Sequence, residues 1–166
     1  MPVHSPIPLV GYYPEGAPHP SWIDCIGVEK VFGSCQKTVT AYGEDVPPLS
    51  CTALTTVRCE IPSCTLLNSV GCPNDLATVS WLVNIPVHYT CDTGSGMVNV
   101  TAPVLTTIYS PPGTKPACIP FSASCGANIF NGMVYAAVTL CLELKTLAQV
   151  QLLVPTYGYC QGPPGE

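Results

Sequence analysis

The chemistry open to this chain lies mainly in its eleven cysteines, which are spread almost from end to end of the 166 residues. No two of them form a C-x-x-C pair, the spacing typical of zinc ribbons, thioredoxin-like redox sites and iron–sulfur clusters. We therefore expect no metal and no cofactor, and we interpret the cysteines as disulfide partners in an oxidising compartment. The candidate disulfide residues are Cys25, Cys35, Cys51, Cys59, Cys64, Cys72, Cys91, Cys118, Cys125, Cys141 and Cys160.

The odd number of cysteines leaves at least one thiol that stays free or bonds to another molecule. Cys25 and Cys160 flank the central part of the chain and suit either tethering of its ends or bonds to a neighbour. Cys141 is out of phase with the apolar positions of its segment, so its thiol should point away from the core. Such a thiol either packs under a loop or bonds outside its own domain. We name Cys25, Cys141 and Cys160 as the candidate intersubunit thiols.

Four further cysteines carry local pairing signals. Cys59 and Cys91 are in phase with apolar positions and are expected to pair inside the fold. Cys118 and Cys125 bracket a short segment and are a candidate pair that closes it as a loop. The full connectivity stays open, because pairing ten of eleven cysteines allows about ten thousand arrangements.

Titratable groups are too few and too scattered to assemble an active site. Charged residues are 9% of the chain, and the three histidines are His4, His19 and His88. None of these histidines is placed with a nucleophile and an orienting partner, as nucleophilic catalysis requires. The carboxylates show neither a glycosidase-like pair nor a calcium loop. We expect no enzymatic activity and no small-molecule substrate.

The charge balance excludes a second class of function. Ten acidic residues against five basic ones give a net charge of -5. Nucleic-acid binding needs a basic stripe, which the single Arg and four scattered Lys do not form. No run of 18 apolar residues occurs, so we expect no membrane span.

Long alternating segments predict the strands that carry these cysteines. Odd positions are apolar over residues 77–91, where Pro86 indicates an edge or a bulge. Residues 98–108 also alternate, with Thr106 as the exception, and residues 92–96 between the two segments have the composition of a hairpin turn. The alternation of residues 134–154 is longer than a normal strand.

We expect that third segment to break near Lys145-Thr146 into two strands. Shorter strand candidates are 25–32, 37–42 and 53–61, which brings the total to seven or eight. The prediction is an all-β fold: an antiparallel β-sandwich, jelly-roll-like and disulfide-bonded, with an extended Pro-rich N-terminal arm. The expected domains are the arm 1–24, the sandwich 25–160 and a short C-terminal tail 161–166.

The predicted arm is too apolar for a solvated linker. Six prolines disfavour helix and sheet within it, and the plainest interpretation is a disordered tail. The alternative is an extended arm that docks on another surface. Its candidate docking residues are Ile7, Leu9, Val10, Tyr12 and Tyr13.

Two stretches carry a family resemblance. Residues 25–35, Cys-Ile-Gly-Val-Glu-Lys-Val-Phe-Gly-Ser-Cys, resemble the opening Cys-x-x-x-x-Lys-Val-Tyr-x-x-Cys signature of cysteine-rich proteins from spore-forming Firmicutes. Residues 150–160, Val-Gln-Leu-Leu-Val-Pro-Thr-Tyr-Gly-Tyr-Cys, look like the close of the same proteins. The general plan also resembles that of endospore appendage subunits, in which a Cys-bearing N-terminal connector and a jelly-roll sandwich build filaments sealed by disulfides. This arm has no cysteine before Cys25, which departs from that connector.

The resemblance implies a structural role. The expected function is a self-assembling subunit of an extracellular or spore-surface filament or coat, a head-to-tail homopolymer whose only partner is the chain itself. The arm would dock on a neighbouring copy like a donated strand, and intermolecular disulfides would seal the contact. The alternative is a secreted or surface binding or adhesion module, with aromatics such as Trp22, Tyr157 and Tyr159 exposed in a groove.

Overall fold

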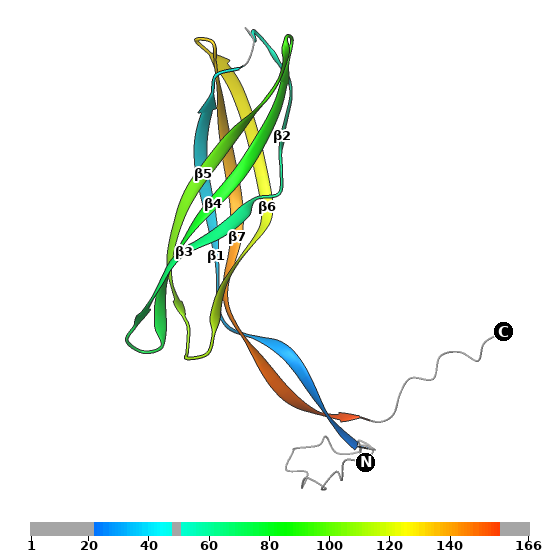
Figure 1. Cartoon of the computed structure of the whole chain (residues 1–166), viewed down its shortest axis with the longest axis vertical. Helices are drawn as coiled ribbons and strands as arrows, with labels where there is room; N and C mark the ends of the chain where they lie inside the picture. Colours follow the sequence, from blue (N-terminus) through cyan, green and yellow to red (C-terminus); the bar gives the residue numbers. More distant parts are fainter. Residues whose placement is uncertain (1–21, 48–50, 157–166) are drawn as a thin grey trace, which may run out of the picture. The chain divides into compact units, whose positions relative to one another are not determined.

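Strands make up almost all of the computed structural model, which describes residues 22–47 and 51–156 (Figure 1). No helix occurs in these ranges, so the predicted all-β class is confirmed. The strands are β1 (Trp22–Asp45), β2 (Leu54–Cys59), β3 (Ser63–Cys72), β4 (Leu76–Cys91), β5 (Gly94–Tyr109), β6 (Lys115–Phe130) and β7 (Met133–Thr156).

The strands form two antiparallel sheets. The first sheet has the order β1-β7-β6. In the second sheet β4 is central: β5 pairs with one side of it over its whole length, and β2 and β3 pair in succession with the other side. β1 and β7, the first and last of the described strands, are therefore neighbours in one sheet.

Pro86 sits inside the central strand β4, so the expectation that it marks an edge or a bulge of its strand is wrong. β2 ends opposite Val87 and β3 begins opposite Asn84, which places Pro86 where one partner strand gives way to the next. Its carbonyl accepts a hydrogen bond from the Glu60 amide at 2.9 Å. A proline is tolerated there because its missing N–H faces the gap between two partner strands.

The β4–β5 hairpin confirms two other predictions. Every odd position from Ala77 to Cys91 is buried, as the alternation indicated. The turn is shorter than predicted: Cys91 pairs with Gly94, so Asp92 and Thr93 are its only two residues. Thr106, the polar exception in the second segment, is only 8% exposed and lies on the buried face of β5.

The break predicted near Lys145-Thr146 is absent, because β7 is one strand of 24 residues. β1, which is also 24 residues long, pairs with it and includes both segments expected as separate strands, 25–32 and 37–42. Gly33 lies between those two segments, where an added Cβ would come within 2.5 Å of the Tyr109 carbonyl oxygen. The lack of a side chain there lets β1 run past β5 without a break.

The two sheets share one buried core. Side chains from β4 and β5 of the second sheet pack with those from β7 of the first. β6 lies beside β2 and β3, to which two disulfides join it. On the other side β1 approaches β5, where Lys37 Nζ donates to the Leu105 carbonyl. β2 and β3 therefore lie along the β6 edge of the first sheet, and β5 lies along its β1 edge.

Contacts divide the chain into two compact units, residues 29–149 and residues 1–28 together with 150–166. We call the first unit the body. We call the described strand ends of the second unit, residues 22–28 and 150–156, the ribbon. The predicted arm 1–24 and tail 161–166 lie outside the described residues except for Trp22–Asp24, which begin β1, so those domain boundaries stay predictions.

Candidate functional site

Among the described residues, three disulfides join six cysteines, all of them within the body. They are Cys51–Cys91, Cys59–Cys125 and Cys64–Cys118, with Cα–Cα distances of 5.8, 6.0 and 6.1 Å. The inward pairing expected for Cys59 and Cys91 is confirmed. Such intramolecular disulfides are typical of proteins of oxidising, extracellular-type compartments.

The predicted Cys118–Cys125 loop is wrong. Both residues lie in the regular strand β6, which holds them too far apart along the chain to pair with each other, and each instead faces a cysteine across the body. No strand was predicted here, and Pro116, Pro120 and Gly126 all disfavour a strand. An edge strand tolerates such residues, and β6 is the edge of its sheet.

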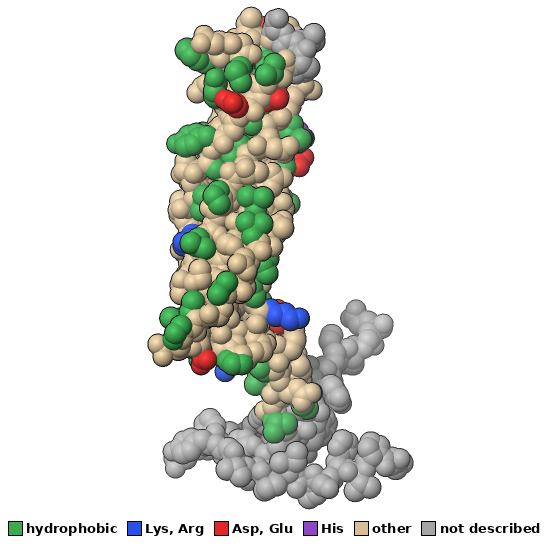
Figure 2. Space-filling model, turned by 60° about the vertical axis from the view of Figure 1, so that its left-hand side comes forward, with side chains coloured by type: hydrophobic (Ala, Val, Ile, Leu, Met, Phe, Trp, Pro, Cys, Tyr) green, Lys and Arg blue, Asp and Glu red, His purple; other side chains and the backbone are tan. Residues whose placement is uncertain are grey.

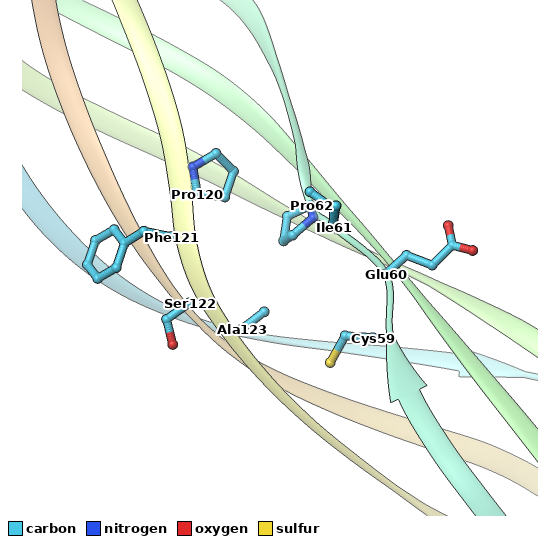
Figure 3. Close-up of a pocket in the computed structure, with 8 residues that line it drawn as sticks. All are labelled: Cys59, Glu60, Ile61, Pro62, Pro120, Phe121, Ser122 and Ala123. Carbon is cyan, nitrogen blue, oxygen red and sulfur yellow. The ribbon is translucent and has the colours of Figure 1, made fainter. Parts of the chain in front are cut away.

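A shallow hollow of about 400 Å³ lies between these two bridges (Figure 3). One wall is the connection between β2 and β3, and the other is β6 near a shift of register between Pro120 and Ser122. Cys59 and Ala123 point into the space between the walls, whereas Phe121 and Glu60 point away from it. The rest of its lining holds one hydroxyl, that of Ser122, beside the apolar side chains of Ile61, Pro62 and Pro120.

Four cysteines of the described residues are free: Cys25, Cys35, Cys72 and Cys141. Cys35 is half-buried on the core side of β1, with its sulfur 3.6 Å from Thr106 Oγ1. Cys72 is half-buried near the β3–β4 turn, with its sulfur 3.5 Å from Thr78 Oγ1. Neither thiol was singled out from the sequence, because nothing in the alternation marks it as unpaired.

Two of the three candidate intersubunit thiols fall within the described residues. The side chain of Cys141 is half-buried, on the face of β7 opposite its buried neighbours Leu140 and Leu142, and its sulfur lies 3.7 Å from Thr38 Oγ1. Cys25 is exposed in the ribbon. Cys160 lies outside the described residues, as do the arm-docking candidates Ile7, Leu9, Val10, Tyr12 and Tyr13.

The ribbon combines exposed apolar side chains with unpaired strand edges. Pairing of β7 with β6 ends at Leu147, so beyond this point β7 has only β1 as a partner in the described residues. Ile26 is 41% exposed, Leu152 46% and Leu153 59%. Because adjacent residues of a strand point to opposite faces, Leu152 and Leu153 make both faces of β7 apolar there. Asp24 is the one charged residue in these two segments.

Three further titratable groups of the body, His88, Tyr89 and Asp92, have structural partners. His88 Nε2 lies 2.6 Å from Glu60 Oε1, on the outer face of the second sheet. The Tyr89 hydroxyl donates to Asp45 Oδ2 at 2.9 Å, and burial, followed by this hydrogen bond and the Asp45 charge, raises the pKa of Tyr89 to about 12. Hydrogen bonds from the Thr52 hydroxyl and amide lower the pKa of the Asp92 carboxyl. His4 and His19 lie outside the described residues.

Cys51, Cys91 and Asp92 bring three potential metal-ligand atoms within 4.8 Å of one another. The two sulfurs are bonded to each other, and metals bind thiolates rather than the sulfurs of a disulfide. Asp92 instead accepts hydrogen bonds from Thr52 next to this bridge. The cluster is therefore a cross-linked turn.

Among the described residues, no helix is long and apolar enough to cross a membrane.

The ribbon is the feature that sequence reasoning missed. Its signal was present, since the alternation of β7 gives way to Val150-Gln151-Leu152-Leu153-Val154, where apolar residues occupy both faces.

Comparison with known proteins adds no relative: no family model, no curated protein and no solved structure matches this chain.

Proposed function

We propose that this chain is a self-assembling structural subunit of an extracellular or spore-surface filament or coat. Subunits join head to tail when the N-terminal arm of one copy docks on the next, and disulfides between copies then seal the contact. The folded part in this proposal is a jelly-roll-like β-sandwich. Two sheets around one core support that assignment, as does the return of the last strand beside the first.

The observation that carries the proposal is the ribbon. An isolated two-stranded ribbon is at best marginally stable in water, and an apolar strand edge is a template for pairing with another chain. This ribbon has two apolar faces and almost no charge to oppose close approach. In sequence, its first strand directly follows most of the predicted arm, whose docking is part of this proposal.

The body supports a durable material. Its three disulfides each contribute about 2–4 kcal/mol to stability. Charged side chains are sparse on the face shown in Figure 2, where hydrophobic ones are scattered among polar groups. Low charge permits close packing of copies, because few ions must be desolvated or neutralised.

The assembly test compares native material on electrophoresis with and without reductant, and by electron microscopy. We expect filaments, and a non-reduced ladder or a species too large to enter the gel that collapses to 17.5 kDa with reductant. Deletion of residues 1–20 should leave a folded monomer. Filaments that persist after this deletion refute arm docking, and a wild-type chain that stays monomeric at high concentration refutes assembly itself.

A matched pair of variants tests the part played by the ribbon. Leu153→Ser removes an apolar side chain that is 59% exposed in the ribbon, and Leu105→Ser removes one that is 61% exposed in the body. We expect Leu153→Ser to abolish filaments while the folded body remains. Equal assembly of the two variants would show that the ribbon has no special role.

The second candidate function is a surface binding module, and a hollow on the outer face of the second sheet, lined in part by Arg58 and His88, favours it. Electron microscopy separates the two candidates, because dispersed monomers under native conditions are expected of a binding module and filaments of a structural subunit.

A further inference from the structure

The outer face of the second sheet contains a hollow of about 660 Å³. Its lining residues come from the end of β4 and from β2 and β5, which pair with β4 on its two sides. These three strands lie side by side in the sheet (Figure 1). The lining residues of the hollow are Thr56, Arg58, His88, Tyr89, Thr90, Ser95, Gly96 and Met97.

Strand register arranges the polar side chains of this hollow in two rows. Thr56, Thr90 and Ser95 are cross-strand neighbours and present three hydroxyls in one row. The Thr90 hydroxyl lies 2.5 Å from that of Thr56 and 2.8 Å from that of Thr55. Hydroxyls both donate and accept hydrogen bonds, so a row of them suits a ligand that itself carries hydroxyls.

The second row places the only arginine of the chain beside those hydroxyls. Arg58 pairs across the strands with His88, and His88 pairs with Met97, two residues along each strand from the hydroxyl row. Positions two apart on a strand share a face, so both rows open on the same side of the sheet.

Arg58 has no carboxylate partner among the described residues, although the chain carries a net charge of -5. The nearest acidic residue in sequence, Glu60, is held by His88 at 2.6 Å instead. A guanidinium offers a planar set of donors that matches an oxyanion. This hollow therefore presents an uncommitted cation next to a row of hydroxyls.

We propose that this hollow binds an acidic saccharide, a sugar that carries a carboxylate or a sulfate group. Arg58 holds the oxyanion, and Thr56, Thr90 and Ser95 bond to the neighbouring sugar hydroxyls. Glu60 carries the same sign of charge as the oxyanion and repels it. The contact of Glu60 with His88 reduces this repulsion. This binding role is independent of assembly, so its test is made on the full chain carrying Leu153→Ser, the variant that is expected to form no filaments.

The experiment titrates the labelled full chain with glucuronate and, separately, with glucose 6-sulfate, while NMR follows the amides of Arg58, Thr90 and Met97. Glucose is the neutral control, and inorganic sulfate is the anion without hydroxyls. We expect saturable shifts at these amides with one or both acidic sugars, and the stronger binder identifies the carboxylate or the sulfate as the recognised group. Absent shifts with both, or equal shifts with glucose, overturn the proposal.

Variants then separate the two rows. Arg58→Gln should weaken binding of the acidic sugar about tenfold, because it removes a charge-assisted hydrogen bond. Lys115→Gln removes the same charge from an exposed site on β6 and should change nothing. Thr90→Val should weaken binding of the acidic sugar but not binding of inorganic sulfate. Equal losses of binding in Arg58→Gln and Lys115→Gln would mean that the sugar is attracted by diffuse charge. Unchanged sugar binding in Thr90→Val would mean that the hydroxyl row does not contact the sugar. Either result refutes the site as stated.

Discussion

The body and the ribbon are built partly from the same two strands, yet they bury their side chains very differently. In the body every even position of β7 from Val134 to Thr146 is at most 2% exposed. A few residues later, Leu152 is 46% exposed. Strand pairing continues in both regions, so pairing alone does not remove apolar side chains from water. A second sheet across the core does so, and the ribbon lacks one among the described residues.

The exposure of the free cysteines follows the same division. Among the described residues, the body holds three disulfides and three free thiols that are all half-buried, whereas the free thiol of the ribbon, Cys25, is exposed. Disulfides in the body restrict its unfolded chain. An exposed thiol in the ribbon can form a disulfide only with another thiol that comes close enough. The body is therefore complete as a single chain, and we infer that the ribbon is completed by a neighbour.

Removing one disulfide of the body should produce the largest difference in stability between variants of the two regions. Replacing Cys59 and Cys125 together by Ala opens a bridge that spans 66 residues and should lower the free energy of unfolding by about 4 kcal/mol. Cys25→Ala in the ribbon should change it by less than about 0.5 kcal/mol. Urea denaturation of the three proteins measures both. Equal stability of the double variant and the wild type would contradict the structural role of this bridge.

Two leucines of the same strand provide the second test. Leu142→Ala leaves a cavity at a fully buried site in β7 and should cost about 3 kcal/mol. Leu152→Ala truncates the same type of side chain in the ribbon and should cost about 0.5 kcal/mol in the monomer. Thermal or urea unfolding gives both values. A large cost at Leu152 in the monomer would mean that the ribbon is packed without any neighbour.

Two glycines extend the comparison to the backbone. An added Cβ at Gly96 would lie 2.2 Å from the Tyr89 hydroxyl oxygen, whereas at Gly27 it would meet nothing within 4 Å. Gly96→Ala should therefore destabilise the body by about 2 kcal/mol, because the Tyr89 ring must move. Gly27→Ala in the ribbon should cause no loss, since nothing obstructs its side chain. Equal unfolding midpoints for the two variants would contradict this difference in packing.

The last expected effect appears only at alkaline pH, as weakening of the body through Tyr89. Its pKa is raised from 10.0 to about 12, so the folded state holds the phenolic proton more tightly than the unfolded chain does. The resulting stabilisation is complete below pH 10 and is lost as the pH rises through about 12. Phenolate absorbance and urea denaturation across this range measure both quantities.

Asp45→Asn is the matched variant for that titration. It removes the carboxylate that accepts the Tyr89 hydrogen bond, and should lower the pKa of Tyr89 only in part because burial is the larger cause. A phenolic titration identical in wild type and variant would show that Asp45 does not act on Tyr89.

Sequence reasoning succeeded where a residue's environment follows from its neighbours in the chain. The inward face of β4 and the turn at Asp92 follow from alternation and turn chemistry, both local properties. It failed at β3, where most residues are exposed and no alternation appears, and at β6, where prolines disguise an edge strand. It also predicted two strands where β7 is one. The usual strand length applies when a strand and its partners end together, whereas β7 continues beyond the end of its pairing with β6.

What the chain determines by itself is therefore the strand class, the inward face of its alternating strands and the supply of thiols. The tertiary structure decided which strands become neighbours, and hence which sulfurs meet: Cys64 and Cys118 are 54 residues apart in the chain and join opposite edges of two sheets. Period-two alternation orients a side chain relative to its own backbone. The choice of partner depends on how both sheets close around one core, which no local segment contains.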